Sequence, residues 1–346
     1  MLAKLTPRDV MRANLYLRTA SRVVVRLAQF KALTFADLEK HARRVAWETV
    51  VAPGRRVAFR VTCRKSRLYH SGAVTQRLMD ALALRVPSAI AAGGAGDDDE
   101  ESGDEQLFVV RLMRDQLVLS ADTSGALLHR RGYRLATAKA PLRETLAAAM
   151  LLGAGWDGRT PLADPLCGSG TIAIEAAMIA RRMAPGRARS FAFQQWPGHD
   201  AAGWRAVHME AALLEEPRSE VAIFAADRDA GAIAAVRANA ERAGVAADLT
   251  IAHQSLSALQ PTAGPGLLVV NPPYGVRVGD KQPLRNLFAQ LGNVARAHAA
   301  GWRIAMLSAD RDLERQVRLP FTEQWKSTNG GIPIRLVTAE VPANAQ

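Results

Sequence analysis

Cysteine is scarce in this sequence, because the 346 residues contain only Cys63 and Cys167. Two cysteines form neither a disulfide framework nor a zinc site, so the composition excludes a small disulfide-rich protein, and we expect no metal. Long apolar runs are also missing, since arginine, glutamate and glycine interrupt the alanine-rich stretches. The chain therefore has no candidate transmembrane helix, and its first residues lack the apolar core of a signal peptide. We expect a cytoplasmic protein with no membrane partner.

Acidic residues are rare in the first quarter of the chain. Residues 1–90 hold 18 lysines and arginines against five aspartates and glutamates, and this segment accounts for the whole formal net charge of +12. A basic segment of this kind favours a polyanionic partner, because neutralising phosphate groups releases counterions. We infer a nucleic-acid-binding surface, with a merely solvated basic face as the alternative.

The first part of the chain has a mixed α+β pattern. Its apolar periodicity predicts strands at 22–30 and 55–63, helices at 34–47 and 69–84, and a hairpin at 107–125 that turns at Arg114 and Asp115. Residues 93–106 contain seven acids and no apolar periodicity, which indicates a disordered or solvated loop.

Strands and helices alternate in the rest of the chain, which predicts a parallel sheet covered on both faces. The expected strands are 160–166, 220–227, 247–254, 266–273 and 303–309. The expected helices are 170–183, 230–244 and 283–299. An insertion rich in phenylalanine, tryptophan, proline and glycine separates Met183 from Glu220.

The segment "DPLCGSGT", residues 164–171, takes an apolar strand into a glycine-rich turn that opens a helix. Gly168 and Gly170 let the backbone approach a ligand, and the free N–H groups of the helix start suit an anionic group. The spacing fits neither a dinucleotide fingerprint nor a phosphate-binding loop with its lysine. A plain strand-to-helix turn is the alternative.

Asp227 ends the strand "IFAAD", residues 223–227. An acid at this place in a doubly wound fold accepts both ribose hydroxyls of an adenosine-type ligand. Asp227 could instead cap the next helix, although Asp229 could serve as that cap. The turn and the acid together indicate a nucleoside cofactor with an anionic group, either a dinucleotide or S-adenosylmethionine.

The segment "VVNPPYG", residues 269–275, favours S-adenosylmethionine. Two prolines directly after a strand force the chain out of the sheet at the edge where such folds bind ligands. The Asn271 side-chain oxygen and an adjacent proline carbonyl can accept both hydrogens of an exocyclic amine and aim its lone pair at an electrophile. Tyr274 offers a flat face for an unstacked base. The alternative is a rigid loop after a buried strand.

These motifs resemble the class I S-adenosylmethionine-dependent RNA guanine-N2 methyltransferases that carry an N-terminal THUMP domain. The resemblance is greatest to the amino-terminal half of the bacterial large-subunit rRNA enzyme, and it covers nearly the full chain. It rests on "LLHRRGYR", "APLRETLAAAML", "DPLCGSGTIAIEAAMIA", "FQQWPGHD", "NPPYG" and "NGGIPIRL". "NPPY" is shared with DNA adenine-N6 enzymes, whereas "DPLCGSGT" followed by "IAIEAA" is narrower.

The resemblance implies an α/β fold: a Rossmann-like class I methyltransferase domain at 136–346, with a parallel sheet ending in an antiparallel strand pair. A basic THUMP-type domain at 1–135 would precede it and bind structured RNA, with rRNA favoured over tRNA. Family members begin further upstream, so we expect a shortened first subdomain. The implied cofactor-binding residues are Asp164, Cys167, Gly168, Ser169, Gly170, Thr171, Asp227 and Ser255. The implied catalytic residues are Asn271, Pro272, Pro273 and Tyr274.

Within this assignment Asp164, Gly168 and Gly170 would hold the methionine end of S-adenosylmethionine, and Asp227 would bind its ribose. Ser255 stands where the family usually has an aspartate that contacts the adenine. The leading function is methylation of the N2 amine of a guanine in RNA, with 23S rRNA favoured. The alternatives are a tRNA guanine-N2 enzyme, a DNA adenine-N6 enzyme and a non-catalytic RNA-binding assembly factor.

Overall fold

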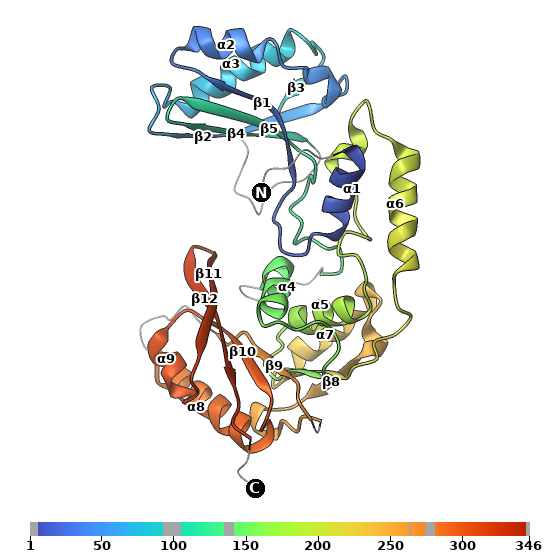
Figure 1. Ribbon diagram of the computed structural model, residues 1–346, viewed down its shortest axis with the longest axis vertical. Coiled ribbons are helices and arrows are strands. Elements are labelled where there is room, and N and C mark those ends of the chain that lie inside the picture. The colour runs from blue at the N-terminus through green and yellow to red at the C-terminus, as the bar shows by residue number, and fades with distance from the viewer. Residues whose placement is uncertain (1–5, 93–104, 135–141, 263, 274–280, 344–346) are drawn as a thin grey trace. The chain divides into compact units, whose positions relative to one another are not determined.

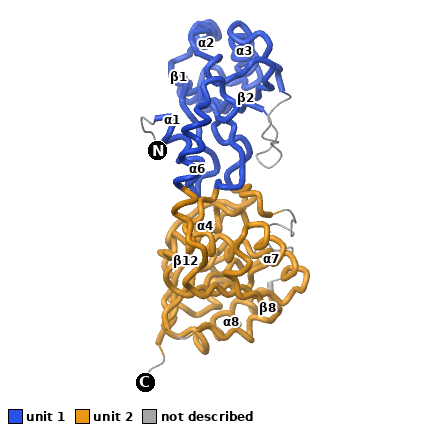
Figure 2. The backbone as a smooth tube through the Cα atoms, turned by 90° about the vertical axis from the view of Figure 1, so that its right-hand side faces the viewer, with its two compact units in different colours: residues 1–128, 186–210 blue, residues 129–185, 211–346 orange. Residues whose placement is uncertain are grey.

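The computed structural model describes residues 6–92, 105–134, 142–262, 264–273 and 281–343 (Figure 1). The chain forms two compact units, which Figure 2 shows in different colours. Unit 1 consists of Met1–Leu128 and Gly186–Glu210, and unit 2 consists of His129–Pro185 and Ala211–Gln346. The sequence led us to expect one boundary near residue 135. The structure instead divides the chain after Leu128. The inserted segment Gly186–Glu210 then belongs to unit 1 again.

Unit 1 contains a five-stranded mixed sheet in the order β1-β5-β4-β2-β3. The strands are β1 (Val24–Lys31), β2 (Arg56–Arg64), β3 (Ile90–Ala91), β4 (Gln106–Met113) and β5 (Gln116–Asp122). Strand β2 runs parallel to β3 and β4, whereas β5 is antiparallel to both β1 and β4. The β4–β5 hairpin turns at Arg114 and Asp115, which both have positive φ, as a tight hairpin turn requires.

Two helices, α2 (Phe35–Ala42) and α3 (Ser71–Ala83), lie on the same side of this sheet (Figure 1). Thr34 and Asp37 form a capping box at the start of α2. The helix ends earlier than the expected residue 47. The buried Trp47 indole donates a hydrogen bond of 2.9 Å to the Ala42 carbonyl, so the chain turns there into a short 3₁₀ helix (Trp47–Thr49).

Helix α1 (Pro7–Tyr16) joins the end of β5 through the buried Asn14. The Asn14 amide donates to Thr123 Oγ1 at 2.8 Å, and its oxygen accepts from Ser124 Oγ at 2.8 Å. The inserted segment packs beside them, because the Gly186 N–H donates to the Leu15 carbonyl at 3.0 Å. A β-carbon at Gly186 would lie 2.9 Å from the Asn14 carbonyl oxygen, so this contact requires glycine.

The inserted segment contains a 3₁₀ turn (Ala192–Gln195) and helix α6 (Ala201–Leu213), which ends beyond the unit boundary. Its aromatic residues mostly contact one another: Trp204 makes edge contacts with Phe191 and Phe193. The Trp196 indole donates to the Gln106 side-chain oxygen at 2.7 Å and so connects the insertion to β4.

Unit 2 contains a seven-stranded sheet in the order β11-β12-β10-β9-β6-β7-β8. The strands are β6 (Leu162–Asp164), β7 (Ile223–Asp227), β8 (Leu249–His253), β9 (Leu267–Val270), β10 (Arg303–Ser308), β11 (Thr322–Asn329) and β12 (Ile332–Glu340). Strands β6 to β10 are mutually parallel, and β12 is antiparallel to both β10 and β11. The predicted Rossmann-like sheet with an antiparallel strand pair at one end is confirmed.

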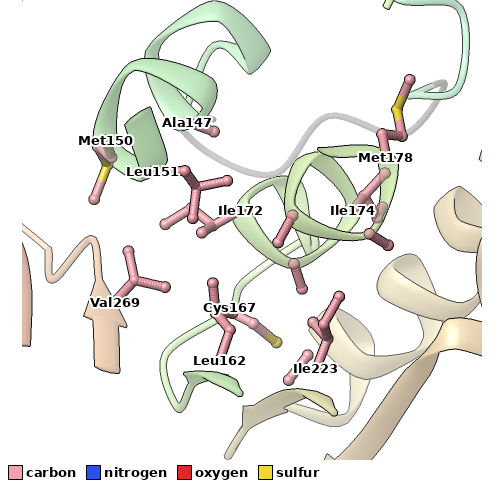
Figure 3. Close-up of a cluster of buried hydrophobic side chains, with 14 of the residues drawn as sticks. Ala147, Met150, Leu151, Leu162, Cys167, Ile172, Ile174, Met178, Ile223 and Val269 are labelled. Carbon is pink, nitrogen blue, oxygen red and sulfur yellow. The ribbon is translucent and has the colours of Figure 1, made fainter. Parts of the chain in front are cut away.

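The helices of unit 2 are α4 (Glu144–Gly153), α5 (Thr171–Ala180), α7 (Ala230–Ala243), α8 (Lys281–His298) and α9 (Arg311–Gln316). Helix α5 is apolar nearly all round and almost wholly buried, which is typical of a helix that lies within the core of a domain. Figure 3 shows its Ile172, Ile174 and Met178 above Leu162 of β6 and Ile223 of β7. This packing fixes the start of α5 against the strand ends. Within the described residues, no helix combines the length and apolar character needed to cross a membrane.

Replacement of Asn14 tests the junction between α1 and β5. We expect Asn14→Ala to lower the free energy of unfolding by about 2 kcal/mol, because Thr123 and Ser124 would each lose a buried hydrogen-bond partner. Urea denaturation measures the effect. Arg12→Ala, on the exposed side of the same helix, should change stability by less than about 0.5 kcal/mol. Equal effects of the two variants would contradict this role of Asn14.

Candidate functional site

The candidate site lies at one edge of the unit 2 sheet, where three neighbouring strands end. Strand β6 pairs in parallel with β7 on one side and with β9 on the other. Asp164 is the last residue of β6, Asp227 is the last of β7, and Asn271 directly follows β9. Because parallel strands end at the same edge, the fold brings the three predicted polar side chains to one place.

The turn between β6 and α5 is held against β7. The Gly168 N–H donates to Asp227 Oδ2 at 3.0 Å, and the Cys167 N–H donates to the Ala226 carbonyl at 3.0 Å. Gly168 has a φ of 51° and Gly170 a φ of 83°, a region that favours glycine. A β-carbon at Gly168 would meet nothing within 4 Å, so the turn leaves open space beside its backbone.

Helix α7 supports the same turn from behind, which the sequence analysis did not predict. Asn239 is fully buried and donates to the Ser169 carbonyl at 3.0 Å. A β-carbon at Gly170 would lie 2.8 Å from a Val236 methyl group, so only glycine fits there. The role of Asn239 could have been suspected from the sequence, because it is a polar residue on the apolar face of the predicted helix 230–244.

Asp164 is buried, with 1% of its surface exposed. It accepts a hydrogen bond of 3.3 Å from the Leu166 N–H, and it forms no ion pair within the described part of the chain. Burial, together with the nearby Asp227 carboxylate, raises the pKa of Asp164 to about 8. A ligand cation at this edge would stabilise the ionised carboxylate and lower that pKa.

Asp227 is only partly buried, and both of its oxygens accept backbone hydrogen bonds. Oδ2 accepts from Gly168, and Oδ1 accepts from the Asp229 N–H at 3.0 Å. Asp229 itself caps α7, since its side chain accepts from the Ala232 N–H at 2.7 Å. Asp227 is therefore not needed as the helix cap, and each of its oxygens keeps a lone pair for a ligand.

Ser255 lies two residues beyond β8, the strand that pairs with β7. Its side chain is exposed, and its hydroxyl lies 2.8 Å from the Ser257 hydroxyl. The Gln254 N–H beside it donates to the Asp227 carbonyl at 3.1 Å. Ser255 thus belongs to the same sheet edge, next to the end of β7.

The Asn271 side chain carries the most informative feature of the site. Its Oδ1 is buried and has no hydrogen-bond partner among the described residues. Pro272 is buried and Pro273 is exposed, so the chain leaves the sheet at this point. Tyr274, the fourth predicted catalytic residue, lies outside the described residues. A buried carbonyl oxygen without a partner costs stability, so a hydrogen bond from a ligand donor would stabilise this group.

The remaining predicted residues form the body of the turn. Cys167, Ser169 and Thr171 are buried, and Thr171 begins α5. Burial raises the pKa of the Cys167 thiol, which keeps it protonated and unsuited to nucleophilic attack. Within the described ranges, no group of three or more histidine, cysteine or acidic side chains is placed to hold a metal ion.

Together these groups can bind a ligand that has a cation near Asp164 and paired hydroxyls near Asp227. The N-terminus of α5 adds N–H groups and a partial positive charge for an anion. Asn271 provides one free acceptor for a donor on a second molecule. The edge thus has the chemistry to bring a zwitterionic nucleoside and an amine together.

The buried Asp164 carboxyl predicts a pH-dependent stability in the absence of ligands. Its folded pKa of about 8 lies above the usual aspartate pKa of 3.8, so between these pH values the folded state holds a proton that the unfolded state has lost. Stability should fall as pH rises through this range, by up to about 1.4 kcal/mol per pH unit. Asp164→Asn should remove that part of the slope, as urea denaturation at several pH values would show. Parallel pH curves for the two proteins would contradict the raised pKa.

Comparison with a curated relative shows similarity to a larger protein. The chain is 37% identical over 341 residues to the ribosomal RNA large subunit methyltransferase K/L of Syntrophotalea carbinolica (strain DSM 2380 / NBRC 103641 / GraBd1). The match covers 95% of this chain and 47% of that relative. The chain therefore spans about half the length of this relative.

Two crystal structures resemble both units of the chain. One is SMU.472, described as a methyltransferase and complexed with SAH, with a TM-score of 0.84 and 28% identity, covering 98% of this chain and 89% of its own. The other is a protein of Listeria monocytogenes str. 4b F2365, described as an N6-adenine-specific DNA methylase, with a TM-score of 0.81 and 30% identity. It covers 95% of this chain and 85% of its own.

A family model described as "RMKL-like, methyltransferase domain" matches residues 131–338. The matched range exceeds half of the chain and contains the whole strand edge from Asp164 to Asn271. The chain belongs to the RMKL-like methyltransferase domain family.

Proposed function

We propose that this chain transfers a methyl group from S-adenosylmethionine to the exocyclic N2 amine of a guanine in RNA, with 23S rRNA as the favoured substrate. The proposal depends most on the buried Asn271 side-chain oxygen, which has no hydrogen-bond partner among the described residues. It lies at the sheet edge that also carries the glycine-rich turn at residues 164–171. An exocyclic amine has the two hydrogens that such an acceptor, together with a neighbouring backbone carbonyl, can bind.

The described residues fit S-adenosylmethionine. Asp164 is a buried carboxyl without a cationic partner in the described chain, and the ammonium of the methionine end would supply one. The open space beside Gly168 and the N–H groups at the start of α5 suit its carboxylate. Asp227 retains acceptor capacity for the ribose hydroxyls, while Ser255 lies where the adenine would end.

The protein residues contribute orientation more than acid–base chemistry. A sulfonium methyl is already an activated electrophile when the cofactor is bound. Asn271 Oδ1 and the Pro272 carbonyl would accept the two amine hydrogens and direct the nitrogen lone pair, which favours the pyramidal nitrogen of the transition state. Tyr274 would stack on the base, and Pro273 would keep the loop out of the sheet. No strong base is required, because the alkylated amine loses its proton readily.

The RNA assignment rests on the rRNA enzyme to which the chain is 37% identical and on the basic first quarter of the sequence. The similarity to a protein described as a DNA adenine methylase supports a second candidate, methylation of an adenine N6 amine. Both reactions need the same acceptor pair, so the site geometry alone fits either amine.

Identification of the methylated nucleoside tests the proposed function. The full chain is incubated with labelled S-adenosylmethionine and, separately, with unmodified 23S rRNA, tRNA and DNA. We expect label in N2-methylguanosine from 23S rRNA, identified by mass spectrometry after digestion. Label in N2-methylguanosine from tRNA would change the substrate, and N6-methyladenine from DNA would overturn the assignment. Absence of transfer to all three would favour a non-catalytic RNA-binding protein.

Two alanine variants should separate orientation from cofactor binding. Asn271→Ala should lower kcat about a hundredfold or more while cofactor affinity, measured by calorimetry, stays within about threefold. Asp227→Ala should weaken cofactor binding about tenfold to a hundredfold, because it removes acceptors for the ribose and for Gly168. Asp227→Asn keeps one acceptor oxygen, so its cofactor binding should weaken less than that of Asp227→Ala. Normal turnover by Asn271→Ala would refute the orienting role.

A further inference from the structure

Unit 1 has a wide groove on the sheet face opposite to α2 and α3. Its volume is about 1230 Å³, and it is lined by strands β1, β2, β4 and β5, the start of α1 and the inserted segment. The side chains that pack against α2 and α3 include Phe59, Phe108 and Leu119. Their neighbours along each strand point to the other face and line the groove.

Register places the polar residues of this face in ordered rows. Arg26 of β1 pairs with Ser120 of β5, Ser120 with Val109 of β4, and Val109 with Arg60 of β2. Arg26 and Arg60 therefore lie in one row, three strand spacings or about 14 Å apart. Arg111 occupies the next row, beside Thr62 of β2. All of these residues line the groove.

Acidic side chains are scarce among the described residues that line the groove. Among its lining residues in the described chain, the only acid is Asp200, whose carboxylate accepts from the Gly203 N–H at 2.8 Å. Arg111 is exposed and makes no hydrogen bond or ion pair within the described residues. Arg22, at the groove end, is already paired with the buried Asp122 at 2.6 Å.

On the side of the unit 1 sheet that α2 and α3 cover, acidic side chains pair with several arginines. There Arg43 and Arg77 both pair with Glu39, and Arg85 pairs with Glu48. Part of the positive charge on that side is thus neutralised within the protein. On the open sheet face, the described lining residues include one acid, Asp200.

The geometry points to this groove as the surface that binds the phosphate backbone of the RNA substrate, with Arg26, Arg60 and Arg111 as the phosphate contacts. This assignment rests on the proposed function and names the part of the protein that would engage its RNA. Rows of arginine on a rigid sheet suit a polyanion, since each guanidinium can bind a phosphate through two N–H groups. The inserted segment, with Trp196 and His199, forms one wall of the groove.

The test compares two variants with the same change in charge. Arg26→Gln/Arg60→Gln/Arg111→Gln alters the groove, and Lys40→Gln/Arg43→Gln/Arg44→Gln alters exposed positions at the end of α2. Fluorescence anisotropy measures binding of labelled single-stranded and duplex segments of 23S rRNA between about 50 and 200 mM salt. We expect the groove variant to bind at least about tenfold more weakly, with a salt slope shallower by about 2 to 3. The α2 variant should remain within about threefold of the wild type.

Cofactor affinity and thermal unfolding of both variants should match the wild type, which excludes loss of folding. Equal weakening by both variants, or none by the groove variant, would overturn the assignment. The outcome is separable from that of the proposed function. A wild-type protein that binds RNA through the groove but methylates no nucleic acid would refute the activity and leave the binding surface intact. Methyl transfer with an unchanged KM in the groove variant would refute the surface alone.

Discussion

The parallel pairing of β6 with both β7 and β9 is the constraint on which the candidate site depends. It makes three strands that are far apart in the sequence end side by side. The Gly168 N–H then reaches the Asp227 carboxylate, which connects the turn of one strand to the tip of the next. Asn271 directly follows β9, the third of these strands. Each residue needs only to stand at the end of its own strand, and the sheet brings the set together.

The site keeps polar groups that the surrounding structure leaves incompletely satisfied. Asp164 is buried with one backbone hydrogen bond, and the Asn271 oxygen is buried with no partner among the described residues. Elsewhere in unit 2 buried charges have partners, such as Arg134 with Glu144 at 3.2 Å. Burial nevertheless raises the pKa of Glu144 to about 7. Under the proposed function, the sheet edge gives up stability for ligand binding, whereas the buried ion pair is internal to the fold.

The local features of the fold could be predicted from sequence, and the long-range contacts could not. Arg114 and Asp115, the Thr34 cap and the glycines of the turn each follow from the conformational preferences of a few neighbouring residues. The early end of α2 depends on where the Trp47 indole donates, which no periodicity reveals. Asn239 supports a turn 70 residues away in sequence, so its role needed the packed structure. The same holds for the insertion, which joins unit 1 through contacts such as Trp196 with Gln106, 90 residues apart in sequence.

The path of the chain between the units has a consequence for how the protein can be divided. The backbone passes from one unit to the other three times, after Leu128, Pro185 and Glu210. No single cut can therefore release an intact unit: a fragment that stops at Leu128 would lack the residues that satisfy the Leu15 carbonyl and the Gln106 side chain. Unit 1 is therefore completed by a segment that lies within the sequence of unit 2, so the two units do not follow one another end to end along the chain.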